Sequence, residues 1–104
     1  MSFLQVSDPS AAQAELFHRS KPLTACYAVH GAADPGLLPR IMAQFAKRGL
    51  TPNRLHADLS ADGRELVIDV QMAGLGPDVA DHIARCLRQV WGVDCVLMSE
   101  KAGL

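Results

Sequence analysis

Residues 29–41 read VHGAADPGLLPRI, and this stretch decides how the rest of the chain can be arranged. Its beginning is typical of the end of a strand, and a helix is predicted to begin at Pro35, a residue that suits the first helical turn. Asp34, directly before it, is a good N-cap residue because its carboxylate can accept a hydrogen bond from a backbone N–H of the first turn. Gly36 leaves that turn without a side chain, and the free N–H groups of a helix N-terminus favour an anionic ligand. The stretch therefore predicts a strand, a candidate binding loop and a helix.

Further elements are predicted outward from this loop by hydrophobic periodicity. The expected order is a strand at 24–30, a helix at 35–48, strands at 50–60 and 64–73, a helix from Pro77 to before Gly92, and a strand at 93–99. The two middle strands are joined by Asp62-Gly63, a strong hairpin signal. A short polar tail is expected from Glu100.

Apolar side chains predict which face of each element is buried. The expected core positions are Leu38, Ile41, Met42 and Phe45 on the first helix and Val79, Ile83, Leu87 and Val90 on the second. In the second predicted strand, Leu55, Ala57 and Leu59 are expected to share one face. Val67, Val96 and Met98 are expected on the sheet face that the helices leave uncovered. A partly apolar open face favours a protein partner.

This order of elements predicts an α+β chain with a ferredoxin-like βαββαβ sandwich, in which two helices cover one face of a four-stranded antiparallel sheet. Residues 1–22 are expected to form an N-terminal extension, either a short helix at about 8–19 or a disordered segment. The domain itself is expected at 23–101, with a tail at 102–104.

Composition excludes several classes of partner. The 104 residues carry a formal net charge of −1 and only 5% aromatic side chains, so we expect neither nucleic acid nor a membrane surface as a partner. The three cysteines, Cys26, Cys86 and Cys95, have no C-x-x-C spacing, which favours free thiols in a reducing compartment over a disulfide or a zinc site. A cytoplasmic location is therefore expected, without a cofactor or a bound metal.

No catalytic constellation is predicted. His56 and Asp58 share one strand face without a third metal ligand, so a solvated pair is the favoured interpretation. His30 lies beside the binding loop and is interpreted as a partly exposed residue with a backbone partner, the alternative being a ligand contact. None of the serines has the context of an activated nucleophile. We therefore expect a protein that is not an enzyme.

From about Tyr27 to Lys101 the chain resembles an ACT domain, a small regulatory module attached to or associated with enzymes of amino-acid metabolism. The resemblance rests on the segment 34–38 (DPGLL) with Ile41 and Phe45, followed by the segment 48–50 (RGL). Within this family the loop is most similar to that of the regulatory small subunit of acetolactate synthase.

The resemblance implies a homodimer in which a small ligand, often an amino acid, lies between the first loop of one copy and the start of the second strand of the other. Carried onto this chain, the ligand-binding residues are Gly31, Asp34, Gly36, Leu37, Thr51 and Asn53. The Leu37 N–H is expected to donate to the ligand, and Thr51 and Asn53 to supply polar contacts. A larger enzyme subunit is the implied partner.

The chain departs from the family pattern at Ala33, where amino-acid-binding members commonly have an Asn, and at Thr51, the expected place of a second Asn. An alternative hypothesis is therefore a ligand-free module for protein–protein interaction or assembly that uses the open sheet face or an edge.

Overall fold

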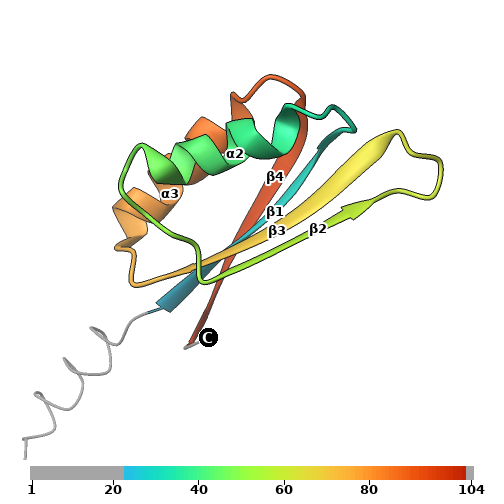
Figure 1. Cartoon of the computed structure of the whole chain (residues 1–104). Helices are drawn as coiled ribbons and strands as arrows, with labels where there is room; N and C mark the ends of the chain where they lie inside the picture. The colour runs from blue at the N-terminus through green and yellow to red at the C-terminus, as the bar shows by residue number, and fades with distance from the viewer. Residues whose placement is uncertain (1–22, 103–104) are drawn as a thin grey trace, which may run out of the picture.

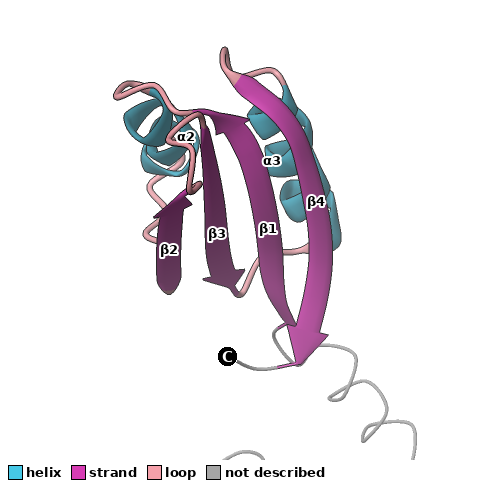
Figure 2. Ribbon diagram, turned by 90° about the vertical axis from the view of Figure 1, so that its right-hand side faces the viewer, coloured by secondary structure: helices cyan, strands magenta, loops and turns pink. Residues whose placement is uncertain are grey.

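The computed structural model describes residues 23–102, and it confirms the expected fold. The helix that the sequence places at 8–19 lies outside the described residues. The elements are β1 (Leu23–Ala32), α2 (Leu37–Ala46), β2 (Arg54–Leu59), β3 (Glu65–Ala73), α3 (Pro77–Arg88) and β4 (Val93–Ala102). Both helices lie on the same side of the sheet (Figure 1), and residues 23–102 place no helix on its opposite face (Figure 2).

The four strands pair in the order β2-β3-β1-β4, and every neighbouring pair is antiparallel. The first strand and the third are therefore central, whereas β2 and β4 form the two edges. This order brings the end of β1 beside the start of β3, since Gly31 pairs with Leu66 and Ala32 with Glu65. The loop after β1 thus lies at the same end of the sheet as the β2–β3 hairpin.

The core lies between the sheet and the two helices. Its fully buried side chains include Val29, Ile68 and Val70 from the sheet and Ile41 and Phe45 from α2. Complete burial of such side chains stabilises the fold by about 1.5–3 kcal/mol each. The helices are consequently fixed to the sheet by apolar packing.

Tyr27 is a polar anchor in the centre of this core. Its hydroxyl donates a hydrogen bond of 2.8 Å to the backbone oxygen of Ala80 in α3, and its ring meets Phe45 edge-on at 5.8 Å between centroids. Burial, assisted by the carboxylates of Asp81 and Glu100, raises the pKa of Tyr27 to about 12. The phenol therefore stays protonated at physiological pH and can keep donating to α3.

Several predicted boundaries and faces are wrong. The first helix begins at Leu37 rather than Pro35, and its fully buried positions are Leu37, Ile41 and Phe45, whereas Leu38 and Met42 are only partly buried. In α3, Ala80 is buried and Val79 is 46% exposed. The buried positions differ because the sheet and the neighbouring helix set the rotation of each helix about its axis.

The last strand is longer than predicted, because β4 includes Glu100 and continues to Ala102, so the expected polar tail from Glu100 is wrong. Its faces are also reversed: Val96 is buried in the core and Met98 packs against it, whereas Leu97 is 67% exposed. The reason is an irregularity in the pairing between β1 and β4, in which His30 pairs with Cys95 but Gly31 with Val93. The extra residue in β4 changes the alternation of its side chains.

The edge strand β2 carries no buried residue. Leu55 pairs with Val70 and Ala57 with Ile68, so these side chains lie on the same sheet face as the core. Leu55 is nevertheless 43% exposed and Leu59 60% exposed. The predicted face is thus correct, but the helices do not cover it at this edge.

Candidate functional site

The candidate binding loop is a tight turn made by Asp34. The Asp34 backbone oxygen accepts a hydrogen bond from the Leu37 N–H at 2.9 Å, and one carboxylate oxygen accepts the Gly36 N–H at 3.0 Å. The first α-helical bond follows, from the Arg40 N–H to the Gly36 oxygen at 3.1 Å. Asp34 therefore organises the entry to the helix from two residues further upstream than an N-cap, and Gly36 occupies the N-cap position.

These bonds correct one part of the sequence interpretation. The N–H groups of Gly36 and Leu37 were expected to be open to a ligand, but both are already hydrogen-bonded to Asp34. In addition, Pro39 has no backbone N–H to offer in the first turn of the helix. A ligand at this loop would depend on side chains and apolar contact more than on the helix N-terminus.

Arg40 joins this loop to a distant part of the chain. One guanidinium nitrogen lies 3.0 Å from the Asp34 carboxylate, and Nε donates to the backbone oxygen of Trp91 at 3.2 Å. The guanidinium also lies 4.8 Å from the centroid of the Trp91 ring, a cation–π contact. Arg40 and Trp91 were not among the predicted site residues, because nothing local in the sequence links positions that lie so far apart.

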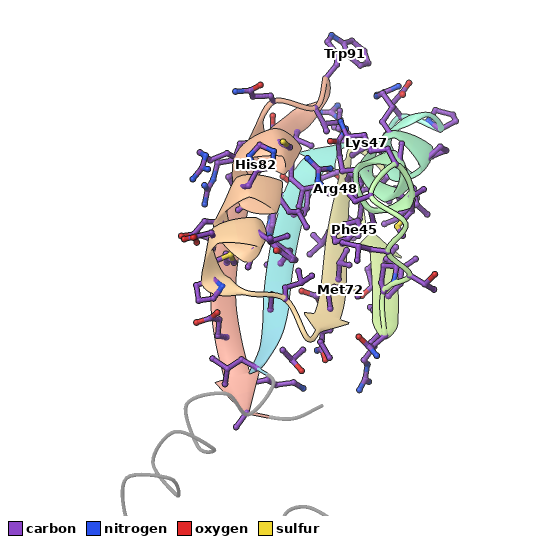
Figure 3. All side chains as sticks on the ribbon, turned by 90° about the vertical axis from the view of Figure 1, so that its left-hand side faces the viewer. Phe45, Lys47, Arg48, Met72, His82 and Trp91 are labelled. Carbon is purple, nitrogen blue, oxygen red and sulfur yellow. The ribbon has the colours of Figure 1, made fainter. Side chains whose placement is uncertain are left out.

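Close packing at the loop requires glycine at position 31, and Gly36 leaves room for the side chains of Arg40 and Asp34. A Cβ on Gly31 would lie 2.5 Å from the backbone oxygen of Gly92 and 2.8 Å from Leu37, and a Cβ on Gly36 would meet the Arg40 guanidinium. Trp91, beside Gly92, projects from this end of the molecule and is 72% exposed (Figure 3). Gly31 and Gly36 therefore shape the site rather than contact a ligand with side chains.

A small hollow of about 200 Å³ adjoins the turn. It is lined by Ala33, Asp34 and Pro35 from the loop and by Leu59 and Leu66 from the hairpin. Four of these five side chains are apolar, and the Asp34 carboxylate is the polar exception. The hollow is thus suited to a small apolar group with a polar substituent.

Thr51 and Asn53 lie just before the start of β2, whereas the hollow beside Asp34 lies at the end of this strand. The Asn53 N–H donates to the Gln71 oxygen at 2.8 Å, and the Asn53 side-chain oxygen accepts the Ala73 N–H at 2.7 Å. The hollow borders Leu66, five residues earlier in β3 than Gln71, which corresponds to about 17 Å along a strand. One copy of the chain therefore does not bring the two predicted halves of the site together.

The remaining polar groups in the described part of the chain form no metal site. Among residues 23–102, no group of three His, Cys, Asp or Glu side chains is arranged to hold an ion. His56 and Asp58 form an exposed pair, with 2.9 Å between Nε2 and the carboxylate. A second hollow, of about 370 Å³, lies on the open sheet face above Ala28, with Asp69 and Leu97 among the residues around it.

Replacing Asp34 with Ala is expected to lower the free energy of unfolding by about 0.5–2 kcal/mol, because the change removes the acceptor of the Gly36 N–H and the partner of Arg40. Urea titration of the two proteins measures the difference. Asp94→Ala, at an exposed position of β4, is the matched control and is expected to change stability by no more than about 0.5 kcal/mol. Equal stabilities for Asp34→Ala and the wild type would contradict the role of Asp34 in the turn.

The order of elements and the order of strands define the class of protein: a small α+β domain with the ferredoxin-like fold, with its candidate site on the loop after the first strand. The family follows from the sequence. The model of a family described as an ACT-like domain matches residues 18–102, so the chain belongs to that family. A search of curated proteins finds no significant match.

Solved structures share the fold at low sequence identity. The ACT domain of GTP pyrophosphokinase from Chlorobium tepidum aligns with a TM-score of 0.64 and 18% identity over 75% of this chain and 99% of that one. The C-terminal domain of the MgtC protein from Mycobacterium tuberculosis aligns with a TM-score of 0.57 and 15% identity, covering 79% of this chain and 90% of that one.

A formyltetrahydrofolate deformylase from Pseudomonas putida KT2440 also contains this fold. It aligns with a TM-score of 0.55 and 8% identity over 77% of this chain, but over only 29% of its own length. The fold therefore occurs there as one part of a larger enzyme. Within residues 23–102 of the present chain, neither helix has the length and hydropathy needed to cross a bilayer.

Proposed function

We propose that this protein is a regulatory ACT domain that works as a homodimer and binds a small amino acid between its two copies. The predicted site has two halves: the hollow beside Asp34, and the segment with Thr51 and Asn53. The observation that carries the proposal is that these two halves lie at opposite ends of β2. The hollow beside Asp34 borders Leu59 at the end of this strand, whereas Asn53 directly precedes its start. If two β2 strands pair antiparallel about a two-fold axis, the start of one strand lies beside the end of the other.

The free edge of β2 supports such pairing. Ser60 donates its N–H to the Glu65 oxygen at 2.8 Å, so this pair is a hydrogen-bonded one in the ladder with β3. By the alternation of an antiparallel ladder, the backbone groups of Leu55, Ala57 and Leu59 point away from β3, toward the open edge. Unpaired strand edges with apolar neighbours are readily extended by another strand.

The hollow indicates the class of ligand. Its apolar lining by Pro35, Leu59 and Leu66 fits a small aliphatic side chain, and the Asp34 carboxylate beside it can accept a hydrogen bond from an ammonium group. An aliphatic amino acid meets both requirements. This class also agrees with the resemblance to the regulatory small subunit of acetolactate synthase, and a larger enzyme of amino-acid metabolism is the partner that we propose.

The mechanism proposed is differential binding rather than catalysis. A ligand held by residues from both copies stabilises the paired arrangement over any other, and a partner enzyme responds to the population of that arrangement. The test is a thermal-shift screen of the purified protein against the twenty amino acids, with its mass in solution measured in parallel. A ligand at 100 times its dissociation constant should add about 2.7 kcal/mol to stability.

Ala57→Pro is expected to convert the dimer to a monomer, because it removes a backbone donor from the open edge without removing one from the ladder with β3. Light scattering coupled to size-exclusion chromatography measures the change in mass. His56→Pro is the contrasting variant: its N–H belongs to the β2–β3 ladder, so it is expected to lower the melting temperature much more than Ala57→Pro does. A stable dimer of folded Ala57→Pro would exclude pairing through this edge.

The second candidate function is a ligand-free assembly module. The observation that favours it is the open sheet face, where Leu97 is exposed beside the hollow of about 370 Å³. Ala33, which has no polar side chain for an amino acid, is consistent with the same hypothesis. A stable dimer whose melting temperature shifts with none of the amino acids would favour this function over the first.

A further inference from the structure

Cys86 lies among basic side chains in the groove between the two helices. Its sulfur is 3.2 Å from a guanidinium nitrogen of Arg48, which follows α2, and 3.6 Å from Nε2 of His82, one turn earlier in α3. Figure 3 shows Arg48 just after the end of α2 and His82 on α3. The cluster is therefore built by side chains from both helices and is separate from the loop described above.

Arg48 is held in place rather than free in solvent. Another guanidinium nitrogen donates to the backbone oxygen of Gln44, one of the carbonyl groups left without a helical partner at the end of α2. The residue is also partly buried. Its positive charge is thus fixed beside the thiol by the end of the helix, which limits the entropy lost when an anion binds there.

The thiol also borders a hollow large enough for part of a small molecule. The hollow has a volume of about 240 Å³ and is lined by Gln44, Lys47, Cys86, Gln89 and Val90. Lys47 adds a second positive charge, and none of these five lining residues is acidic. The two amide side chains can donate hydrogen bonds, so this hollow suits an anionic group next to the sulfur.

The other two thiols lack this arrangement. The sulfur of Cys26 donates to the backbone oxygen of Thr24 at 3.8 Å, and Cys95 is the most exposed of the three. Asp94 is the chain neighbour of Cys95, so its nearest formal charge along the chain is negative. If exposure alone governed reactivity, Cys95 would react first.

We propose that Cys86 is a modification site that takes up small anionic disulfides by thiol–disulfide exchange. The sulfur of Cys86, after its proton passes to His82 or to water, attacks one sulfur of the disulfide. A new S–S bond forms to Cys86, the original S–S bond breaks, and the other half leaves as a thiolate. The Arg48 guanidinium and Lys47 attract the anionic reagent, and Arg48 stabilises negative charge on the reacting sulfurs.

The test compares two aromatic disulfides: dithiobis(nitrobenzoate), which carries two negative charges, and dithiodipyridine, which carries none. Each reagent is tested on two variants that keep a single cysteine. Cys26→Ser/Cys95→Ser retains Cys86, and Cys26→Ser/Cys86→Ser retains Cys95. The quantity compared is the ratio of the rate with the anionic reagent to the rate with the neutral one, followed by absorbance. We expect this ratio to be roughly tenfold higher at Cys86 than at Cys95.

Charge variants show whether the local cations cause the difference. Arg48→Gln and, separately, the exposed Lys47→Gln, both in the chain that retains Cys86, are expected to lower the ratio toward that of Cys95. Arg54→Gln, which removes an exposed cation from β2, is the matched control and is expected to leave it unchanged. Equal ratios at the two thiols, or a ratio unaffected by both Arg48→Gln and Lys47→Gln, would overturn the proposal.

Discussion

Gly31→Ala is expected to lower the free energy of unfolding by about 1–3 kcal/mol, although it adds a single methyl group. The new Cβ would lie 2.5 Å from the backbone oxygen of Gly92, which itself accepts the Ala32 N–H at 2.8 Å. A backbone oxygen in a ladder cannot turn aside as the end of a long side chain can. The start of β4 must therefore move away from β1, at the cost of hydrogen bonds there.

Gly76→Ala is the control for Gly31→Ala. Gly76 has φ −69° and ψ 157°, a conformation open to any residue, and nothing lies within 4 Å of the position of its Cβ. Alanine there is expected to change the free energy of unfolding by less than about 1 kcal/mol, because its restriction of the unfolded chain is opposed by the preference for glycine over alanine at the N-cap of α3. Thermal and urea unfolding measure both variants, and equal stabilities would show that β1 and β4 are not in close contact at Gly31.

The Gly31→Ala experiment bears on function because Gly31 is one of the predicted ligand-binding residues. The structure assigns it a packing role, which permits the close approach of β4 and of Leu37. If Gly31→Ala weakens ligand binding, the loss follows from a displaced loop rather than from a lost contact. The change in stability, measured without ligand, separates the two explanations.

Phe45→Ala is expected to have the largest effect on stability, a loss of about 3–5 kcal/mol. The side chain is fully buried, and its ring packs against Tyr27 at an interplanar angle of 72°. Removing it leaves a cavity between α2 and the sheet and deprives the Tyr27 ring of its edge-on contact. Urea unfolding followed by circular dichroism measures the loss.

Val79→Ala is the matched control, since Val79 is an apolar helical residue that is 46% exposed. It is expected to change the free energy of unfolding by less than about 0.5 kcal/mol. The pair also tests the corrected helix faces, because the sequence pattern placed both residues in the core. A similar loss of unfolding free energy for Phe45→Ala and Val79→Ala would support the buried positions predicted from the sequence over those in the structure.

Much of the fold could be predicted because its signals are local. Gly49 and Gly92, which have positive φ of 71° and 97°, mark where the helical segments stop, and Asp62-Gly63 marks the hairpin. Each signal depends on residues only a few positions apart, within reach of one turn of backbone. The order of six elements followed from them, and with it the ferredoxin-like topology.

The candidate site was less predictable. The loop at Asp34 was located correctly in the chain, but the partners of its backbone groups were not. Arg40 meets Trp91 across 51 positions of sequence, and Arg48 meets Cys86 across 38. No periodicity connects residues at such separations, so neither cluster could be recognised before the helices were placed on the sheet.

The sequence by itself determined which segments form strands and helices and where the turns between them fall, because these depend on neighbouring residues. Only the tertiary structure decided which apolar faces are covered. Val96 faces the core because the pairing of β4 with β1 is irregular beside Gly31, and Leu59 stays exposed at the end of the edge strand β2, which carries no buried residue. The physical reason is that burial depends on the fit of whole layers, in which a one-residue shift in a strand exchanges its two faces.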